Sequence, residues 1–190
     1  QALGSFIGLS AGSYTLSAQD ANLCVKDTII NITEPAPVSI LSQASVNVSC
    51  ASANDGSINI TATGGTSPYT YVLNPGAIAT NNTGIFTLLN PGIYSVEVSD
   101  NSGCGPVTTL PLTITEPLSL TRDSVISKDI TCAGSDNAEI HIYTSGGTSP
   151  YNYSIDDGTS YGVLSDFSVL TAGTYQLSVK DAMACSLNLD

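Results

Sequence analysis

The chain has 190 residues, of which sixteen are acidic and four basic, and its formal net charge at pH 7 is −12. Since it has no basic patch and no apolar run near the ~20 residues that cross a bilayer, we expect no nucleic-acid partner and no membrane insertion. An acidic surface rich in Ser, Thr and Asn is typical of an extracellular protein.

The first 35 residues predict short strands and no helix. The strands are expected at Phe6–Leu9, Ser13–Ala18 and Val25–Ile32. Thr33-Glu34-Pro35 follows, and because proline cannot donate to a strand ladder, this tripeptide predicts a joint between domains. The pattern begins partway through a unit at Gln1, so we expect the chain to be a segment of a much longer one.

Residues 36–117 predict about seven short strands. The alternation is clearest at Ser57–Thr63, where Ile58 and Ile60 share one face. Asn54-Asp55-Gly56 and Gly64-Gly65 are turn signals on either side of this strand. The expected strands are a broken Val38–Leu41 with Val46–Val48, then Ser57–Thr63, Pro68–Leu73, Gly84–Leu89, Ile93–Ser99 and Leu110–Ile114.

The chain is a tandem repeat of about 80 residues. Every phenylalanine stands eight residues before an aligned tyrosine, in the pairs Phe6/Tyr14, Phe86/Tyr94 and Phe167/Tyr175. A unit of this length buries its own core, so each repeat should be a separate small domain. We therefore divide the chain into the C-terminal strands of a truncated repeat at 1–35, a complete repeat at 36–117, and a repeat at 118–190 that lacks its last strand.

Short strands with turn signals every eight to twelve residues predict an all-β fold of tandem immunoglobulin-like antiparallel β-sandwiches. The recurring Leu-x-Pro/Ala-Gly-x-Tyr element predicts a tyrosine corner, in which a tyrosine hydroxyl bonds to backbone a few residues upstream. The candidates are Tyr14, Tyr94 and Tyr175.

Four motifs of the complete repeat together resemble a known family. They are Cys-x-x-x-x-Asp-Gly-Ser-Ile from Cys50, Gly-Gly-Thr-Ser-Pro-Tyr-x-Tyr from Gly64, Leu-x-Pro-Gly-x-Tyr-x-Val-x-Val-x-Asp-x-x-Gly-Cys from Leu89, and Thr115-Glu116-Pro117. This combination resembles the SprB-type repeat of giant cell-surface adhesins of gliding Bacteroidota. The third unit departs from it at Ala138 and Ala184, which are turn positions.

The resemblance implies export by type IX secretion, display on the outer surface of the cell, and contact with surface polysaccharides or the substratum. It also implies the gliding machinery as a partner. We expect an extracellular stalk or adhesive segment; the alternatives are a glycan-binding module and an inert spacer of a large secreted polysaccharide-active protein.

No Ser/His/Asp, Cys/His or paired-carboxylate arrangement can be assembled, so we expect no enzyme. His141, between Ile140 and Ile142, is expected to be an inert surface residue.

The cysteines recur as the pairs Cys50/Cys104 and Cys132/Cys185, and Cys24 is left with a partner outside the segment. In a surface protein this pattern predicts disulfides, and we expect pairing within each repeat. A bridge over roughly 50 residues would stabilise a domain by about 4 kcal/mol. However, the first and last inter-strand loops of an immunoglobulin-like domain lie at opposite ends. A bridge from Cys50 to Cys185 between neighbouring repeats, and free thiols, stay open as alternatives.

Oxygen-bearing side chains are expected to gather where the second and third repeats meet. Asn54, Asp55, Glu116 and Asp181 would suit Ca²⁺ at this joint. The alternative is turn chemistry, because Asp and Asn side chains also cap turns by accepting backbone hydrogen bonds. We expect no other cofactor.

Two kinds of surface feature complete the candidates. Four tyrosines could form a stacking platform for sugar rings, or could pack in and around the core: Tyr69, Tyr71, Tyr151 and Tyr153. Thr28 and Ser124 each follow an aspartate and precede an aliphatic residue, which resembles the O-glycosylation acceptor motif of this bacterial group.

Overall fold

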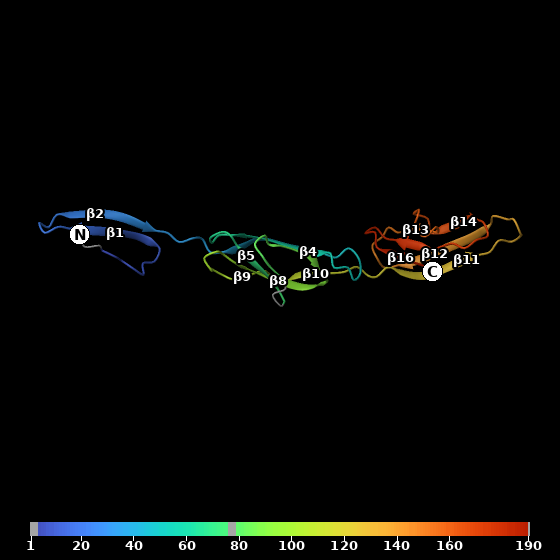
Figure 1. The fold of residues 1–190 in the computed structure, drawn as a ribbon, viewed down its shortest axis with the longest axis horizontal. Coiled ribbons are helices and arrows are strands. Elements are labelled where there is room, and N and C mark those ends of the chain that lie inside the picture. The colour runs from blue at the N-terminus through green and yellow to red at the C-terminus, as the bar shows by residue number, and fades with distance from the viewer. Residues whose placement is uncertain (1–3, 76–78, 190) are drawn as a thin grey trace.

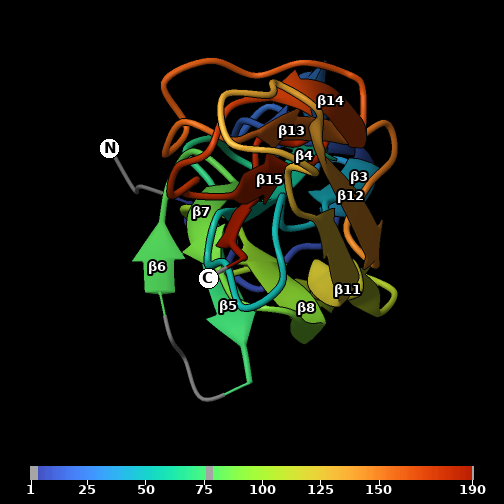
Figure 2. The same cartoon turned by 90° about the vertical axis from the view of Figure 1, so that its right-hand side faces the viewer.

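The computed structural model describes residues 4–75 and 79–189, and all regular secondary structure in these ranges is β-strand (Figure 1). Three β-units follow one another along an elongated molecule, and the end-on view shows them one behind another (Figure 2). The prediction of an all-β fold with antiparallel sheets is confirmed.

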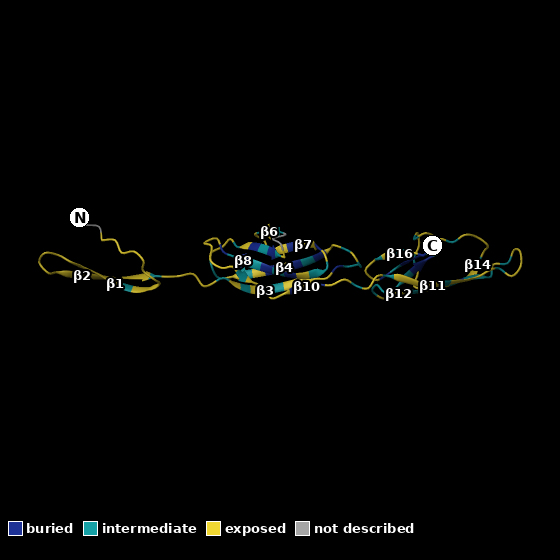
Figure 3. Cartoon of the chain, turned by 90° about the horizontal axis from the view of Figure 1, so that it is seen from below, coloured by how far each residue is buried: buried dark blue, intermediate teal, exposed yellow. Residues whose placement is uncertain are grey.

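The first unit is a two-stranded hairpin. β1 (Gly12–Gln19) pairs antiparallel with β2 (Val25–Ile32), from Gly12 opposite Ile32 to Gln19 opposite Val25. Most apolar side chains of this hairpin are exposed, including Leu16 at 37% and Ile30 at 45%, and Tyr14 and Ile32 are half-buried. Figure 3 shows the unit almost entirely in the colour of exposed residues, because no second sheet of the described chain covers it.

The second unit is built from two antiparallel sheets. One sheet has the order β3 (Ser39–Val46), β4 (Gly56–Thr63) and β7 (Ile85–Leu89). The other has the order β10 (Leu112–Ile114), β8 (Gly92–Ser99), β5 (Thr70–Asn74) and β6 (Ala79–Asn81), with β9 (Val107–Thr108) also paired to β8. Side chains from both sheets form one buried core, so this unit is a β-sandwich.

The core of the second unit follows the alternation seen in the sequence. Ile58 and Ile60 of β4 face Leu73 of β5 and Val96 and Val98 of β8, and all five are at most 1% exposed. Side chains on alternate positions of a strand point to one face of a sheet, so each strand supplies every second residue to this core.

A bulge in β7 departs from simple alternation. Phe86 and Leu89 are three positions apart, yet both are buried, at 4% and 8% exposure. The pairing with β4 shifts here, and Leu88 takes a φ of 59°, in the left-handed region. The extra residue turns Leu89 back toward the core. Val169 holds the same conformation at the equivalent place in the third unit, with a φ of 60°.

The third unit repeats this arrangement. One sheet has the order β11 (Thr121–Lys128), β12 (Ala138–Ser145) and β14 (Asp166–Leu170), and the other has the order β13 (Asn152–Ser154), β15 (Ser178–Lys180) and β16 (Ser186–Asn188). β16 pairs with β15 as β9 pairs with β8, so the described part of the third unit has a short strand in the region where none is expected. A counterpart of β10 is not among the described residues.

Each predicted tyrosine of the recurring Gly-x-Tyr element makes the same hydrogen bond. The hydroxyls of Tyr14, Tyr94 and Tyr175 donate to the carbonyl oxygen four residues earlier, at 2.9, 2.9 and 3.0 Å. This is the geometry of a tyrosine corner. Of the three, Tyr94 is buried at 9% exposure, and its ring belongs to the core of the second unit.

We predict that Tyr94→Phe destabilises the second unit by about 1 kcal/mol, because it removes one hydrogen bond and leaves the carbonyl of Asn90 without that donor. Urea unfolding followed by circular dichroism measures the change. Tyr14→Phe is the matched control, since Tyr14 lies on the exposed hairpin and should leave the transition of the second unit in place. An equal effect of the two variants on the transition of the second unit would contradict the stabilising role of the Tyr94 hydrogen bond.

Candidate functional site

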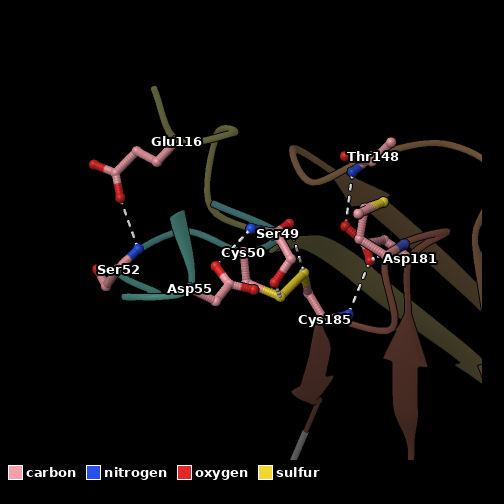
Figure 4. Close-up of a disulfide and its surroundings, with 9 residues drawn as sticks. Ser49, Cys50, Ser52, Asp55, Glu116, Thr148, Asp181 and Cys185 are labelled. Carbon is pink, nitrogen blue, oxygen red and sulfur yellow. Dashed lines mark hydrogen bonds between the residues drawn. A yellow bond between two sulfur atoms is a disulfide. The ribbon is translucent and has the colours of Figure 1, made fainter. Parts of the chain in front are cut away.

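The joint between the second and third units carries a disulfide bond. Cys50, in the loop after β3, is bonded to Cys185, in the loop before β16, with a Cα–Cα distance of 5.7 Å (Figure 4). The two cysteines are 135 positions apart in the chain. The bond therefore joins the far end of one unit to the near end of the next.

The expected pairing within each repeat is wrong. β3 runs toward the third unit, so Cys50 lies at that end, where the Val48 amide donates to the Thr115 carbonyl. Cys104 follows β8 at the opposite end, where the Asn101 amide donates to the Thr66 carbonyl. The length of the sandwich separates the two sulfurs, and the alternative bridge between neighbouring repeats is the one that forms.

Asp181 positions Cys185 for this bond. Its Oδ1 accepts the backbone N–H groups of Met183 and Cys185, each at 2.9 Å, and closes the loop that carries the cysteine. Its Oδ2 accepts the N–H of Thr148 at 2.8 Å, from the loop between β12 and β13. Asp181 is only 2% exposed, so one buried carboxylate ties two loops together at the end of the unit that faces the disulfide (Figure 4).

The other two units contain the same carboxylate. In the second unit Asp100 accepts the N–H groups of Thr66, Ser102 and Cys104 at 2.8, 3.0 and 2.7 Å. The bond from Thr66 is the main cause of a lowered pKa of Asp100, because it stabilises the charged form. In the first unit Asp20 accepts the N–H groups of Asn22 and Cys24, both at 2.9 Å.

A Gly-Gly pair stands directly before Thr66 and Thr148, whose N–H groups donate to Asp100 and Asp181, and it leaves space for these carboxylates. A Cβ on Gly147 would lie 2.7 Å from Oδ2 of Asp181, and a Cβ on Gly65 would lie 2.8 Å from Oδ2 of Asp100. Both glycines have a φ near +60°, in the left-handed region. Side chains of L residues fit neither the space nor the backbone, which explains Gly-Gly in this motif.

The other side of the disulfide is held by carboxylates of the second unit. Asp55 Oδ1 accepts the N–H of Ser49 at 2.9 Å, and hydrogen bonds from Ser49 lower the pKa of Asp55. Glu116 Oε2 accepts the N–H of Ser52 at 2.6 Å, which ties the connecting segment to the loop of Cys50. Cys50 is thus presented by a loop that is fixed from two directions (Figure 4).

The four residues expected to bind calcium all lie near this joint, but their contacts match turn chemistry. Asp55, Glu116 and Asp181 accept backbone N–H groups, and Asn54 is exposed beside Asp55. Among the described residues no three His, Cys, Asp or Glu side chains gather closely enough to hold a metal ion. Calcium at the joint stays a prediction.

The remaining cysteines form no disulfide in the structure. Cys24, Cys104 and Cys132 are exposed thiols. Cys24 and Cys104 lie on loops closed by the same aspartate contact that holds Cys185, and the loop of Cys132 is closed by Asn137, whose Oδ1 accepts the N–H of Thr131 at 3.1 Å. Each thiol is therefore presented much as the bonded cysteines are.

Two stretches of the chain, residues 42–78 and 124–160, match the family model of the SprB repeat. They run from within β3 through β5 of the second unit and from within β11 through β13 of the third, and include the turn after Cys50 or Cys132 and the Gly-Gly loop. The second and third units thus each contain one stretch that is similar to the SprB repeat, and these two units are called the SprB repeats below. No curated protein matches the chain. The disulfide thus links two consecutive SprB repeats.

The SprB repeat is a structural repeat of large surface adhesins and not an enzyme family, which indicates a repeat segment of such an adhesin. In the part of the chain that is described, no helix has the length and apolar character needed to cross a membrane.

Of the two interpretations of the four tyrosines, packing in the core holds for Tyr71 and Tyr153. Tyr71 and Tyr153 lie in the cores of the two SprB repeats, at 5% and 8% exposure, and cannot stack on a ligand. Tyr69 and Tyr151 are half-buried, and their hydroxyls donate to the carbonyl oxygens of Gly64 and Gly146, both at 2.6 Å. These two tyrosines close the Gly-Gly loops of their repeats.

The two candidate glycosylation residues lie on strands with exposed side chains. Thr28 is on β2 of the first unit and Ser124 is on β11 of the second SprB repeat. Both positions are open to a modifying enzyme in the described structure, and their modification stays a prediction.

His141 has partners that the sequence did not indicate. Its Nδ1 lies 2.6 Å from Oδ1 of Asp166 on β14, and its Nε2 lies 3.6 Å from Oε2 of Glu139. Glu139 also pairs with Lys128 at 3.0 Å. The hydrogen bond with Asp166 is the main reason that the pKa of His141 is raised above 6.5.

We predict three reactive thiols in the oxidised native chain and five after denaturation with a reductant, because only Cys50 and Cys185 are bonded. Titration with an aromatic disulfide reagent measures both numbers. Pairing within each repeat would leave only Cys24 free, so a single thiol in the oxidised chain would refute the structure at this joint.

We predict that His141 titrates above pH 6.5 in the folded protein and that Asp166→Asn lowers this midpoint, since the carboxylate stabilises the imidazolium. Because the folded-state pKa is raised, the contribution to stability is complete below pH 6.5 and is lost as the pH rises through the folded-state pKa. NMR of the ring protons gives the midpoint. Asp157→Asn is the control, and an equal shift in both variants would speak against the pair.

Proposed function

We propose that this chain is a stalk segment of a long extracellular adhesin, which attaches cells to surfaces and takes part in their gliding. The observation that supports this most directly is the disulfide between consecutive SprB repeats. A covalent link between the far end of one domain and the near end of the next suits a protein that has to span a distance.

The chemistry of the surface agrees with an extracellular place. Disulfides persist in oxidising surroundings and are rare in the cytosol. The net charge of −12 disfavours direct binding of these repeats to anionic membrane surfaces. On this proposal the chain is exported by type IX secretion, stays attached to the outer membrane, and is moved by the gliding machinery.

Attachment of living cells tests the proposal. Antibodies against the chain should label intact cells that produce the protein, and loss of the protein should reduce both their attachment to glass and their gliding. Return of the complete protein should restore both properties. Absence of label on intact cells, or unchanged attachment without the protein, would refute an adhesin.

Binding of the oxidised chain to polysaccharides and to glass shows where the contact is made. We expect the SprB repeats to act mainly as the stalk, because their tyrosines are occupied in the fold: Tyr71 and Tyr153 are buried, and Tyr69 and Tyr151 bond to their own loops. The folded chain should therefore show no saturable sugar binding. Saturable binding that Tyr69→Ala removes would instead make these repeats a glycan-binding module.

A further inference from the structure

The disulfide gives the molecule two covalent routes between the start of the second unit and the end of the third. One route passes through every residue. The other runs from Ala36 to Cys50, crosses the sulfur–sulfur bond, and continues from Cys185 to Leu189. The second route leaves out residues 51–184, which hold most of both SprB repeats.

More than half of the short route's first stretch is already an extended strand. β3 (Ser39–Val46) fills most of residues 36–50, and β16 (Ser186–Asn188) starts directly after Cys185. A strand rises about 3.3 Å per residue, and a fully stretched chain reaches only about 3.6 Å per residue. Tension along β3 therefore lengthens it very little.

β3 also stays paired while it carries tension. It faces β4 from Ser39 opposite Thr63 to Val46 opposite Ser57. Beyond its end, the Val48 amide donates to the Thr115 carbonyl at 3.2 Å. A pull that acts on both ends of an extended strand does not draw it out of its sheet, so these hydrogen bonds do not have to break.

We propose that the Cys50–Cys185 disulfide is a mechanical limiter. Tension along the stalk passes through β3, the sulfur–sulfur bond and β16, and the enclosed residues stay folded because they carry none of it. The sandwich cores around Ile58 and Val96 in the second unit and Val179 in the third then have no part in resisting the load. This role goes beyond attachment, and it holds for any stalk with this connectivity.

Single-molecule force spectroscopy on the chain, held by its two ends, tests the proposal. In the oxidised chain we expect the first hairpin to open and no unfolding step from either SprB repeat. After reduction both repeats should unfold in steps. The final length should then grow by about 460 Å, from the 135-residue separation at about 3.4 Å per residue.

Variants separate this bond from the other cysteines. Cys50→Ser should give the long, stepwise extension without reductant, and circular dichroism shows whether it keeps its β-structure. The double variant Cys104→Ser with Cys132→Ser should behave as the unchanged chain, since both are free thiols. Because the wild-type chain is reduced in place, the comparison also holds if Cys50→Ser fails to fold.

Two results would overturn the proposal. One is a final length of the oxidised chain that reduction does not change, which would mean that the bond carries no load. The other is a step from either SprB repeat in the oxidised chain, which would mean that tension unravels β3 from its sheet. Neither result depends on whether the protein attaches cells to surfaces.

Discussion

The buried carboxylate of Asp181 is the contact on which the joint depends. With one oxygen it closes the loop that carries Cys185, and with the other it holds the loop around Thr148. A charge at 2% exposure is costly unless it is fully hydrogen-bonded, and three backbone N–H groups meet that need. The direction in which Cys185 points is thus fixed by the fold of its own repeat, before any partner is present.

An equivalent contact between an aspartate and a cysteine recurs in all three units. Asp20, Asp100 and Asp181 each stand four residues before a cysteine, and each accepts the N–H of that cysteine. On the opposite side Ser49 is held by Asp55, and Thr131 by Asn137. Because these hydrogen bonds hold both cysteine loops, formation of the disulfide orders little additional chain. The bond therefore retains most of its stabilising free energy, roughly 5 kcal/mol for a loop of this length.

Much of the fold could be predicted from the sequence, because it depends on local pattern. The alternation at Ile58 and Ile60 gives the buried face of β4, and the repeated glycine-x-tyrosine element gives the hydrogen bonds of Tyr94 and Tyr175. The bulge at Leu88 was not predictable in this way. A non-glycine residue with a positive φ leaves no mark in the alternation, although the spacing of Phe86 and Leu89 contains the hint.

The site was harder to predict, because it depends on which ends of the domains meet. The spacing of the cysteines favours pairs within a repeat, whereas the expected topology places the loops of Cys50 and Cys104 at opposite ends of a domain. The direction of β3 relative to β8 decides between the two, because it puts Cys50 at the end that faces the third unit. The sequence also fits Asp181 as a metal ligand. The signal for its real contact was the Asp-x-x-x-Cys spacing in all three units, which favours a loop closed by the aspartate.

The covalent loop between Cys50 and Cys185 has a consequence for damage as well. The segments that connect the strands of the two SprB repeats, including the stretch between β13 and β14, lie almost entirely inside this loop. Connecting segments are where proteases usually cut. A chain that is cut once between these two cysteines stays in one piece. A surface protein with this linkage therefore keeps its two ends covalently connected after a cleavage that would separate the domains of a chain without the disulfide.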